Sequence, residues 1–313
     1  MVFLCLFRIK TGSLQAYQMV IMKGMVKRRL MTYKKTSDVL KIRISDGKQN
    51  FETDIILNRR RFRGERRRNM EQKFVDKMRS ETEELGITLS DRQLEQFYQY
   101  YEMLVEWNKV MNLTAITEME EVVTKHFVDS LCMIKSETDL ETCSKTVIDV
   151  GTGAGFPGIP LKIAFPGLKI TLLDSLNKRI NFLKEVCSAL GLSGVEMIHG
   201  RAEDFGKNPK YREKFDYCVS RAVANTATLS EYCLPFVKVG GAFLPYKSGK
   251  IEEELKEGTK AIESMGGAVE NVIHFSLIGA DAERTLVKIK KVSATPKRYP
   301  RKAGVPSKEP IKM

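Results

Sequence analysis

Asp149-Val150-Gly151-Thr152-Gly153-Ala154-Gly155 is the stretch that decides the fold. It follows a short β-branched run at residues 146–150 and precedes an apolar segment of helical spacing at residues 159–165. Glycines at such a strand-to-helix turn let the backbone bend sharply and come close to a ligand. The stretch therefore predicts a nucleoside-binding turn in an α/β fold. A glycine turn that binds nothing, with Asp149 as a cap, is the structural alternative.

Downstream of this turn, short apolar runs alternate with segments of helical spacing. That alternation is typical of a parallel sheet with helices on both faces. The expected strands cover residues 146–150, 169–173, 195–199, 215–220, 241–246, 269–276 and 285–290. The expected helices cover residues 159–165, 178–190, 227–237 and 252–265. The fold class is thus α/β, with a sheet of about seven strands.

Upstream of the turn, residues 70–143 have a helical pattern. Ser90 and Gln93 have the spacing of a capping box, which begins a helix reaching about Trp107. Further helices are expected at residues 70–85 and 120–134. We expect a small helical subdomain whose aromatic side chains form core rather than a platform for bases.

The formal net charge of +13 comes from the ends of the chain. Residues 1–69 hold 18 Lys and Arg against 5 Asp and Glu, and residues 284–313 hold 10 against one. We divide the chain into a basic, disordered extension (1–69), the helical subdomain (70–143), a cofactor-binding domain (144–292) and a basic tail (293–313) that lies extended on the surface. A start codon assigned too far upstream is the preferred interpretation of residues 1–69, and a phosphate-binding arm is the alternative.

Several function classes are disfavoured by composition. The six cysteines form no C-x-x-C pair and the three histidines are scattered, which argues against a metal site and a disulfide framework. No apolar run reaches the roughly 18–20 residues of a membrane helix. We expect a cytoplasmic protein that binds no metal and no membrane.

The acid before the first glycine favours S-adenosylmethionine over a dinucleotide. Asp149 would stabilise a cationic ammonium, whereas a pyrophosphate prefers bare N–H groups. Asp174 ends the second strand, 23 residues after Gly151, where a carboxylate can accept hydrogen bonds from ribose hydroxyls. The expected cofactor-binding residues of this region are Asp149, Gly151, Gly153, Gly155 and Asp174. A dinucleotide-dependent oxidoreductase and a non-catalytic RNA-binding module stay open as alternatives.

Later strand ends supply further candidates. Ala202 and Glu203 follow the third strand, where a loop can contact an adenine, and Lys247 follows the fifth. Arg221 ends the fourth strand, beside the reactive end of a cofactor, and is the candidate positioning residue for catalysis. The chain lacks an Asn/Asp-Pro-Pro-Tyr/Phe tetrapeptide and a Pro-Cys dipeptide. An acceptor that needs no deprotonation, such as guanine N7, fits these absences, and no general base is expected.

The sequence resembles a known family, the 16S ribosomal RNA guanine-N7 methyltransferases called RsmG or GidB. The matching blocks are Trp107–Thr114, His126–Ser130, Asp149–Pro160, Leu172–Ser175 with Lys178-Arg179, Ser220–Ala222, and Glu283-Arg284. The resemblance covers about residues 70–313, and residues 1–69 correspond to nothing in the family. It implies a Rossmann-like class I methyltransferase sheet with an N-terminal helical addition. It also implies cofactor contacts at Gly151, Phe156, Ala202, Glu203 and Arg221.

With such a family, the substrate expected is 16S ribosomal RNA or the small ribosomal subunit, and the protein is expected to act as a monomer. Basic side chains near the site and in the tail can contact RNA phosphates, which orient the RNA while a loop base gives selectivity. The expected RNA contacts are Lys247, Arg284, Lys297, Arg298, Arg301 and Lys302.

Overall fold

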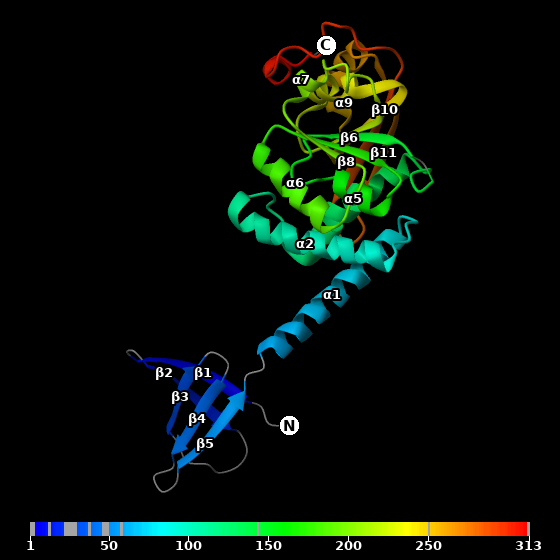
Figure 1. Ribbon diagram of the computed structural model, residues 1–313. Helices are drawn as coiled ribbons and strands as arrows, with labels where there is room; N and C mark the ends of the chain where they lie inside the picture. Colours follow the sequence, from blue (N-terminus) through cyan, green and yellow to red (C-terminus); the bar gives the residue numbers. More distant parts are fainter. Residues whose placement is uncertain are drawn as a thin grey trace. The chain divides into compact units, whose positions relative to one another are not determined.

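The computed structural model describes residues 4–11, 14–21, 30–36, 39–45, 50–56, 59–142, 144–249 and 251–311, with side chains from residue 70 onward. The chain divides into two compact units, Met1–Met70 and Glu71–Met313. Figure 1 colours both along the sequence.

The first unit contains two small antiparallel sheets, one of two strands and one of three. The strands are β1 Leu4–Thr11, β2 Leu14–Ile21, β3 Leu30–Thr36, β4 Val39–Ser45 and β5 Asn50–Ile56. They differ from the expected disordered extension. The segment of β4 does alternate apolar and basic residues with the period of a strand, which is the signal that predicts it. That residues 1–69 are dispensable stays a prediction.

Helix α1, Arg59–Glu83, begins at the first of seven arginines that lie within residues 59–68, and it continues past the expected boundary at Met70. Arginine is a good helix former, and these residues contain no proline. The described side chains of α1 include Phe74 and Met78, which are fully buried as expected for one apolar face.

A sheet of seven strands organises the second unit, in the order β11-β12-β10-β9-β6-β7-β8. The strands are β6 Thr146–Val150, β7 Lys169–Asp174, β8 Val195–His199, β9 Phe215–Arg221, β10 Val237–Ser248, β11 Gly267–Ser276 and β12 Glu283–Lys291. All seven expected strands are confirmed within a few residues. From β6 the chain adds β7 and β8 on one side and then returns to add β9 and β10 on the other. In an open α/β sheet, ligands bind at the carboxyl ends of the strands where the strand order reverses in this way, which here is the end of β6.

One strand of the sheet, β12, runs antiparallel to its neighbours, which corrects the expectation of a wholly parallel sheet. β12 pairs antiparallel with β10 and with β11, whereas β10, β9, β6, β7 and β8 are parallel neighbours. Only residues 277–282 join β11 to β12. That connection is too short for the crossover that parallel strands need.

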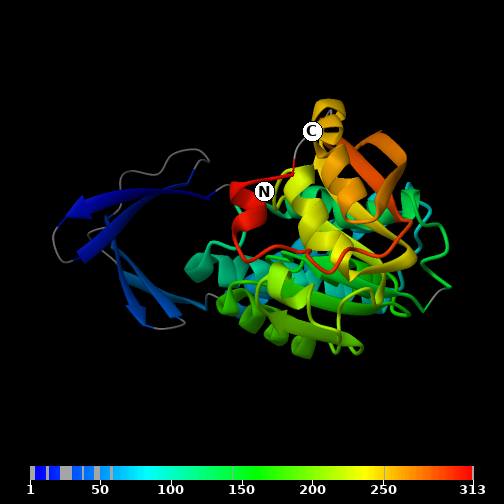
Figure 2. The ribbon, with the colours of Figure 1, turned by 90° about the horizontal axis from the view of Figure 1, so that it is seen from above.

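Helices cover both faces of the sheet (Figures 1 and 2). They are α5 Gly158–Ala164, α6 Asn177–Ala189, α7 Ala202–Phe205, α8 Thr226–Cys233 and α9 Glu252–Ser264. Alternate residues of each strand point to opposite faces. Ile170 and Leu172 of β7 therefore join the core beneath α5 and α6, while Leu173 joins the core beneath α8 and α9.

Helix α2, Asp91–Met111, lies across α5 and α6 and shares their core. The capping box of Ser90 and Gln93 is confirmed, and Gln93 also donates to the backbone oxygens of Ile163 and Ala164. The expected helix at 120–134 is broken into several turns: α3 Met119–Val122, a π-helical turn Val123–Val128, α4 Asp129–Leu131 and a 3₁₀ turn Cys132–Lys135. The division of the chain at residue 143 stays a prediction.

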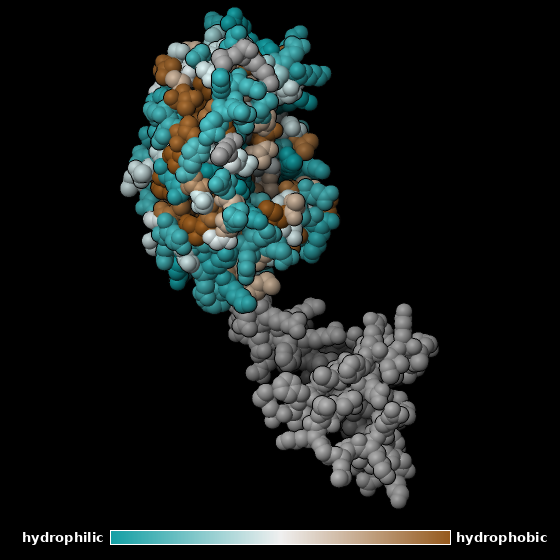
Figure 3. Space-filling model, turned by 180° about the vertical axis from the view of Figure 1, so that it is seen from behind, coloured by the Kyte–Doolittle hydropathy of each residue, from teal (hydrophilic) through white to brown (hydrophobic). Residues whose placement is uncertain are grey.

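The C-terminal segment packs on the surface of the domain. It contains α10, Val305–Lys308, and Thr228 of α8 donates to the backbone oxygen of Pro306 over 3.1 Å. Figure 2 shows this segment in red. The face of the second unit seen in Figure 3 is mainly hydrophilic, with hydrophobic residues showing between the polar ones.

Candidate active site

The glycine loop between β6 and α5 has a backbone that only glycine adopts readily. Gly151, Gly153 and Gly155 have φ values of +72°, +62° and +101°. A Cβ on Gly151 would lie 2.6 Å from Cγ2 of Val223, and one on Gly155 would lie 2.7 Å from the Tyr100 hydroxyl. The loop is therefore closely packed as well as sharply turned.

Asp149 lies beneath this loop and is fully buried. Its Oδ2 accepts hydrogen bonds from the Thr152 hydroxyl over 2.7 Å and from the Gly158 N–H over 2.9 Å. Its Oδ1 is buried without a hydrogen-bond partner among the described residues. Burial raises the pKa of Asp149 to about 6, against the smaller lowering by those two hydrogen bonds. The carboxylate thus ties both ends of the loop to β6.

Asp174 at the end of β7 is also buried, and it faces the loop from the next strand. Its Oδ2 accepts from the Gly153 N–H over 2.9 Å and lies 3.2 Å from Nη1 of Arg179. Its Oδ1 accepts from the Leu176 N–H over 2.9 Å. One carboxylate therefore joins the two strand ends at which sequence reasoning places the cofactor.

Two cavities meet at these strand ends. The larger, of about 770 Å³, is lined among others by Leu113, Thr114, Lys125, His126, Asp129, Gly151, Thr152, Gly153, Phe156, Asp174, Arg179, Arg221, Tyr246, Lys247, Glu254 and Arg284. The smaller, of about 140 Å³, is lined by Val150, Gly151, Leu173, Asp174, Ser175, Gly200, Arg201, Ala202, Glu203, Val223 and Tyr232. Most of the expected cofactor residues thus line one of two neighbouring cavities, which share Gly151 and Asp174. Asp149 and Gly155 line neither cavity.

Glu203 of α7 is buried, and its carboxylate accepts a hydrogen bond from the Gly304 N–H over 2.7 Å. The C-terminal segment therefore contacts a residue that lines the smaller cavity. This contact was not expected from the sequence.

Aromatic rings form one wall of the larger cavity. His126 stacks on Phe156 with ring centroids 4.6 Å apart, and the Arg221 guanidinium lies 5.0 Å from the centre of the Phe156 ring. The Nε2 of His126 lies 2.7 Å from the Thr114 hydroxyl. Burial, and secondly the charge of Arg221, lower the pKa of His126 to about 3, so the imidazole is neutral at physiological pH.

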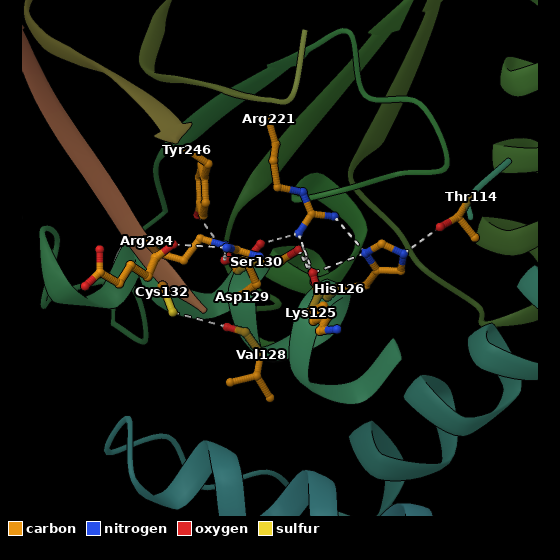
Figure 4. A network of polar contacts seen from close by, with 11 residues as sticks. Thr114, Lys125, His126, Val128, Asp129, Ser130, Cys132, Arg221, Tyr246 and Arg284 are labelled. Atoms are coloured by element: carbon orange, nitrogen blue, oxygen red, sulfur yellow. Dashed lines mark hydrogen bonds and ion pairs between the residues drawn. The ribbon is translucent and has the colours of Figure 1, made fainter. Parts of the chain in front are cut away.

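Arg221 ends β9 and reaches across to α4 (Figure 4). Its Nη1 lies 2.8 Å from Oδ2 of Asp129 and donates at 3.3 and 3.4 Å to the backbone oxygens of Lys125 and His126. Arg284 approaches the same carboxylate, with Nε 3.1 Å from Oδ1 of Asp129. Both arginines were expected at the site, and Asp129 brings them together.

Lys247 lies at the cavity in an ion pair, with Nζ 2.6 Å from Oε1 of Glu254. In the tail, Arg301 is bound to the buried Glu231, with an Nη2–Oε2 distance of 2.7 Å. An arginine held in this way has few donors left for RNA. Lys297, Arg298 and Lys302 are exposed. All of these RNA contacts stay predictions.

Sequence reasoning missed three site residues, His126, Asp129 and Arg179. The block His126–Ser130 did hold a signal, because positions three apart on a helix share one face, and His126 and Asp129 both face Arg221. Arg179 was part of a matched block but had no assigned role. The contacts of His126 and Asp129 with Arg221, and of Arg179 with Asp174, cannot be predicted from local spacing in the sequence.

Other expectations concern features away from the cavities. Cys132, Cys187, Cys218 and Cys233 are buried, and burial raises the pKa of the Cys132 and Cys187 thiols to about 12. Within the described part of the chain, no cluster of His, Cys, Asp and Glu could hold a metal ion. No helix among the described residues is long and apolar enough to cross a membrane.

Comparison with known proteins places the chain among methyltransferases. A family model described as GidB, rRNA small subunit methyltransferase G, matches residues 93–286. The ribosomal RNA small subunit methyltransferase G of Lachnoclostridium phytofermentans is 57% identical over 238 residues, which cover 76% of this chain and 96% of the relative. That of Alkaliphilus metalliredigens is 52% identical over 243 residues, covering 78% and 100%. A solved SAM-dependent methyltransferase from Aquifex aeolicus is similar at a TM-score of 0.37 and 21% identity, covering 50% of this chain and 87% of that one.

Proposed function

Because the chain belongs to the rRNA small subunit methyltransferase G family, we propose that it transfers a methyl group from S-adenosylmethionine to N7 of a guanine in the RNA of the small ribosomal subunit. The relatives are named as ribosomal RNA methyltransferases. Their sequences are more than 50% identical to this chain over nearly their whole length. This membership argues against the oxidoreductase and the non-catalytic RNA-binding module.

The observation that carries the cofactor assignment is the pair of cavities around Gly151 and Asp174. A side chain at Gly151 would fill this cradle, and the buried Asp174 could accept from ribose hydroxyls while it holds the loop. Ala202 and Glu203 line the smaller cavity, which suits an adenine. S-adenosylmethionine supplies an electrophilic methyl group on a sulfonium. The residues present fit this cofactor.

The larger cavity leaves room for an acceptor base, and its charged groups support an acceptor that needs no general base. The three carboxylates that line it are all paired: Asp129 with Arg221 and Arg284, Asp174 with Arg179, and Glu254 with Lys247. The neutral imidazole of His126, with a pKa of about 3, is a weak base. Guanine N7 carries a free lone pair, so the chain needs mainly to align it with the methyl group.

The route of the RNA is proposed from the basic side chains. Arg284 lies in the cavity wall, and Lys297, Arg298 and Lys302 offer exposed cations in the tail. Phosphate contacts of this kind orient an RNA without reading its sequence. A single-stranded loop base that turns into the cavity would then supply selectivity.

We also infer that the protein acts as a monomer in the cytoplasm, where ribosomal subunits are assembled. The exposed large hydrophobic side chains of the second unit are scattered along its sequence: Val110, Leu176, Val223, Val239, Val269 and Val292. Scattered apolar residues are normal on a monomer.

A labelled-methyl assay tests the proposal. Purified protein is incubated with S-adenosylmethionine carrying a tritiated methyl group and with small ribosomal subunits from cells that lack this gene. The expected product is one N7-methylguanine per subunit RNA, with no label on large-subunit RNA. Label on another base, or on RNA of either subunit alike, would contradict the assignment.

A further inference from the structure

One buried carboxylate holds two arginines that come from separate strands. Asp129 lies on α4, Arg221 ends β9 and Arg284 lies near the start of β12, so the three residues come from three elements (Figure 4). Each carboxylate oxygen takes one arginine: Oδ2 is 2.8 Å from Nη1 of Arg221, and Oδ1 is 3.1 Å from Nε of Arg284. The Asp129 side chain is only 3% exposed.

Without this carboxylate, nothing of comparable strength would hold the two guanidinium groups side by side. The other protein partners of Arg221 are the backbone oxygens of Lys125 and His126, at 3.3 and 3.4 Å, and Nδ1 of His126 at 3.5 Å. Arg284 has in addition the backbone oxygen of Glu283. These neutral contacts are long or local, and two cations at short range repel each other.

The three residues all line the larger cavity, and the arginines keep donors free for a ligand. Neither Nε of Arg221 nor Nη2 of Arg284 has a hydrogen-bond partner among the described residues. The three side chains together carry one net positive charge. Arg221 also lies over the ring of Phe156, so its position is coupled to the end of the glycine loop.

We propose that Asp129 is a positioning residue of the methyl transfer, which aligns Arg221 and Arg284 at the cavity wall. The inference rests on the proposed function, because it assigns Asp129 a part in that reaction. Asp129 acts through the arginines, which present their remaining donors to an oxyanion of the substrates. Its contribution is therefore to alignment in the transition state rather than to the affinity for RNA or cofactor.

The test compares Asp129→Asn with the wild-type protein in the methylation of small ribosomal subunits. Because the substitution removes alignment and not positive charge, we expect kcat to fall about tenfold to a hundredfold. The KM for the subunit is expected to stay within about threefold. Each kcat is divided by the number of moles of S-adenosylmethionine that one mole of protein binds in calorimetry. Misfolded protein, which binds no cofactor, then does not lower the normalised kcat. Asp129→Glu, which keeps the charge but moves it outward by one methylene, should lose less.

Asp216→Asn is the matched control. Asp216 lies at the opposite end of β9 and pairs with Lys238, with an Nζ–Oδ1 distance of 2.6 Å. The control removes an ion-paired carboxylate from the domain without touching either cavity. We expect its normalised kcat to equal that of the wild type.

A double-mutant cycle distinguishes positioning from a structural role. If Asp129 acts through Arg221, then Asp129→Asn should reduce kcat much less in an Arg221→Lys background than in the wild type. Additive effects would overturn the proposal. A normalised kcat for Asp129→Asn equal to that of Asp216→Asn would overturn it as well.

A readout that needs no activity separates this inference from the proposed function. In ¹⁵N-labelled protein, the Nε–H of Arg284 should exchange slowly with water, and Asp129→Asn but not Asp216→Asn should accelerate the exchange at least tenfold. Unchanged exchange overturns the positioning role whatever the reaction is. A wild-type protein that methylates no ribosomal RNA but shows this exchange pattern contradicts the proposed function alone.

Discussion

The backbone N–H of Gly153 donates to Oδ2 of Asp174 over 2.9 Å. This hydrogen bond joins the glycine loop after β6 to the acid at the end of β7. The glycine loop and the acid at the end of the second strand, which are two separate signals in the sequence, are thus one structural unit. The carboxylate that is expected to accept hydrogen bonds from the ribose also holds the glycine loop in its left-handed backbone conformation.

Replacing Asp174 tests this double role. Asp174→Ala removes the acceptor of three hydrogen bonds, those from Gly153, Leu176 and Arg179. Loss of a hydrogen bond to a charged group costs about 1.5–3 kcal/mol, so S-adenosylmethionine should bind roughly ten- to hundredfold more weakly. Calorimetry measures the affinity, with Asp216→Ala as the control. Equal affinities for the two variants would place the cofactor elsewhere.

Alanine substitutions at two glycines distinguish the cost of a strained backbone from the loss of the cofactor site. Gly151 and Gly191 have φ values of +72° and +63°, but a Cβ has nothing within 4 Å at Gly191 and meets Val223 at 2.6 Å at Gly151. Alanine at either position should cost about 1–2 kcal/mol of stability from the left-handed backbone. Only Gly151→Ala should also abolish S-adenosylmethionine binding in calorimetry. Retained binding in folded Gly151→Ala would remove Gly151 from the site.

The buried acid beneath the loop predicts a pH dependence of stability. Burial raises the pKa of Asp149 to about 6 from an ordinary value of 3.8, so the folded protein holds this proton more tightly than the unfolded chain does. Its contribution to stability is present below about pH 4 and is lost as the pH rises through 6. The shift of about two pK units corresponds to about 3 kcal/mol.

Urea unfolding of the wild type and Asp149→Asn at pH 4 and pH 7 measures this contribution. The free energy of unfolding of the wild type should fall relative to the variant by up to about 3 kcal/mol between the two pH values. All other titratable groups are common to both proteins, so their effect on the free energy of unfolding cancels in the comparison. Parallel pH profiles would mean that Asp149 titrates normally.

A truncated protein that begins at Met70 tests the status of residues 1–69. The second compact unit begins at Glu71, and every expected site residue lies within it. We expect the truncated protein to fold and to methylate ribosomal subunits at the wild-type rate. Since it loses 18 basic and 5 acidic residues, its RNA affinity in filter binding should be lower and less dependent on salt. Loss of methyl transfer would make residues 1–69 part of the working enzyme.

Much of the fold could be predicted because its signals are local. Each strand of the seven-stranded sheet contains an apolar or β-branched stretch that can be read locally, and the capping box of α2 needs only Ser90 and Gln93. The reversed direction of β12 was not predicted although its signal was present, since residues 277–282 are too few for a crossover between parallel strands. The π-helical turn at Val123–Val128 has no comparable local pattern.

The site could be predicted only in part, because its ion pairs join distant residues. Asp129 lies 92 residues from Arg221 and 155 from Arg284 in the sequence, and only the packing of α4 against the sheet brings them together. The same holds for Arg301, whose expected place in an RNA-binding tail did not reveal its pairing with Glu231. Residue types at strand ends thus indicate where the active site lies. Which of its charged side chains form ion pairs, and which remain available to a ligand, depends on packing between residues distant in the sequence.

We propose above that the protein methylates guanine N7 in small-subunit ribosomal RNA. Mapping N7-methylguanine across ribosomal RNA from cells with the gene, without it, and with the Gly151→Ala variant tests this claim most directly. We expect one modified guanine in the small-subunit RNA, whose methylation disappears without the gene and is not restored by the variant. An unchanged N7-methylguanine pattern in cells without the gene, or full restoration by Gly151→Ala, would contradict it.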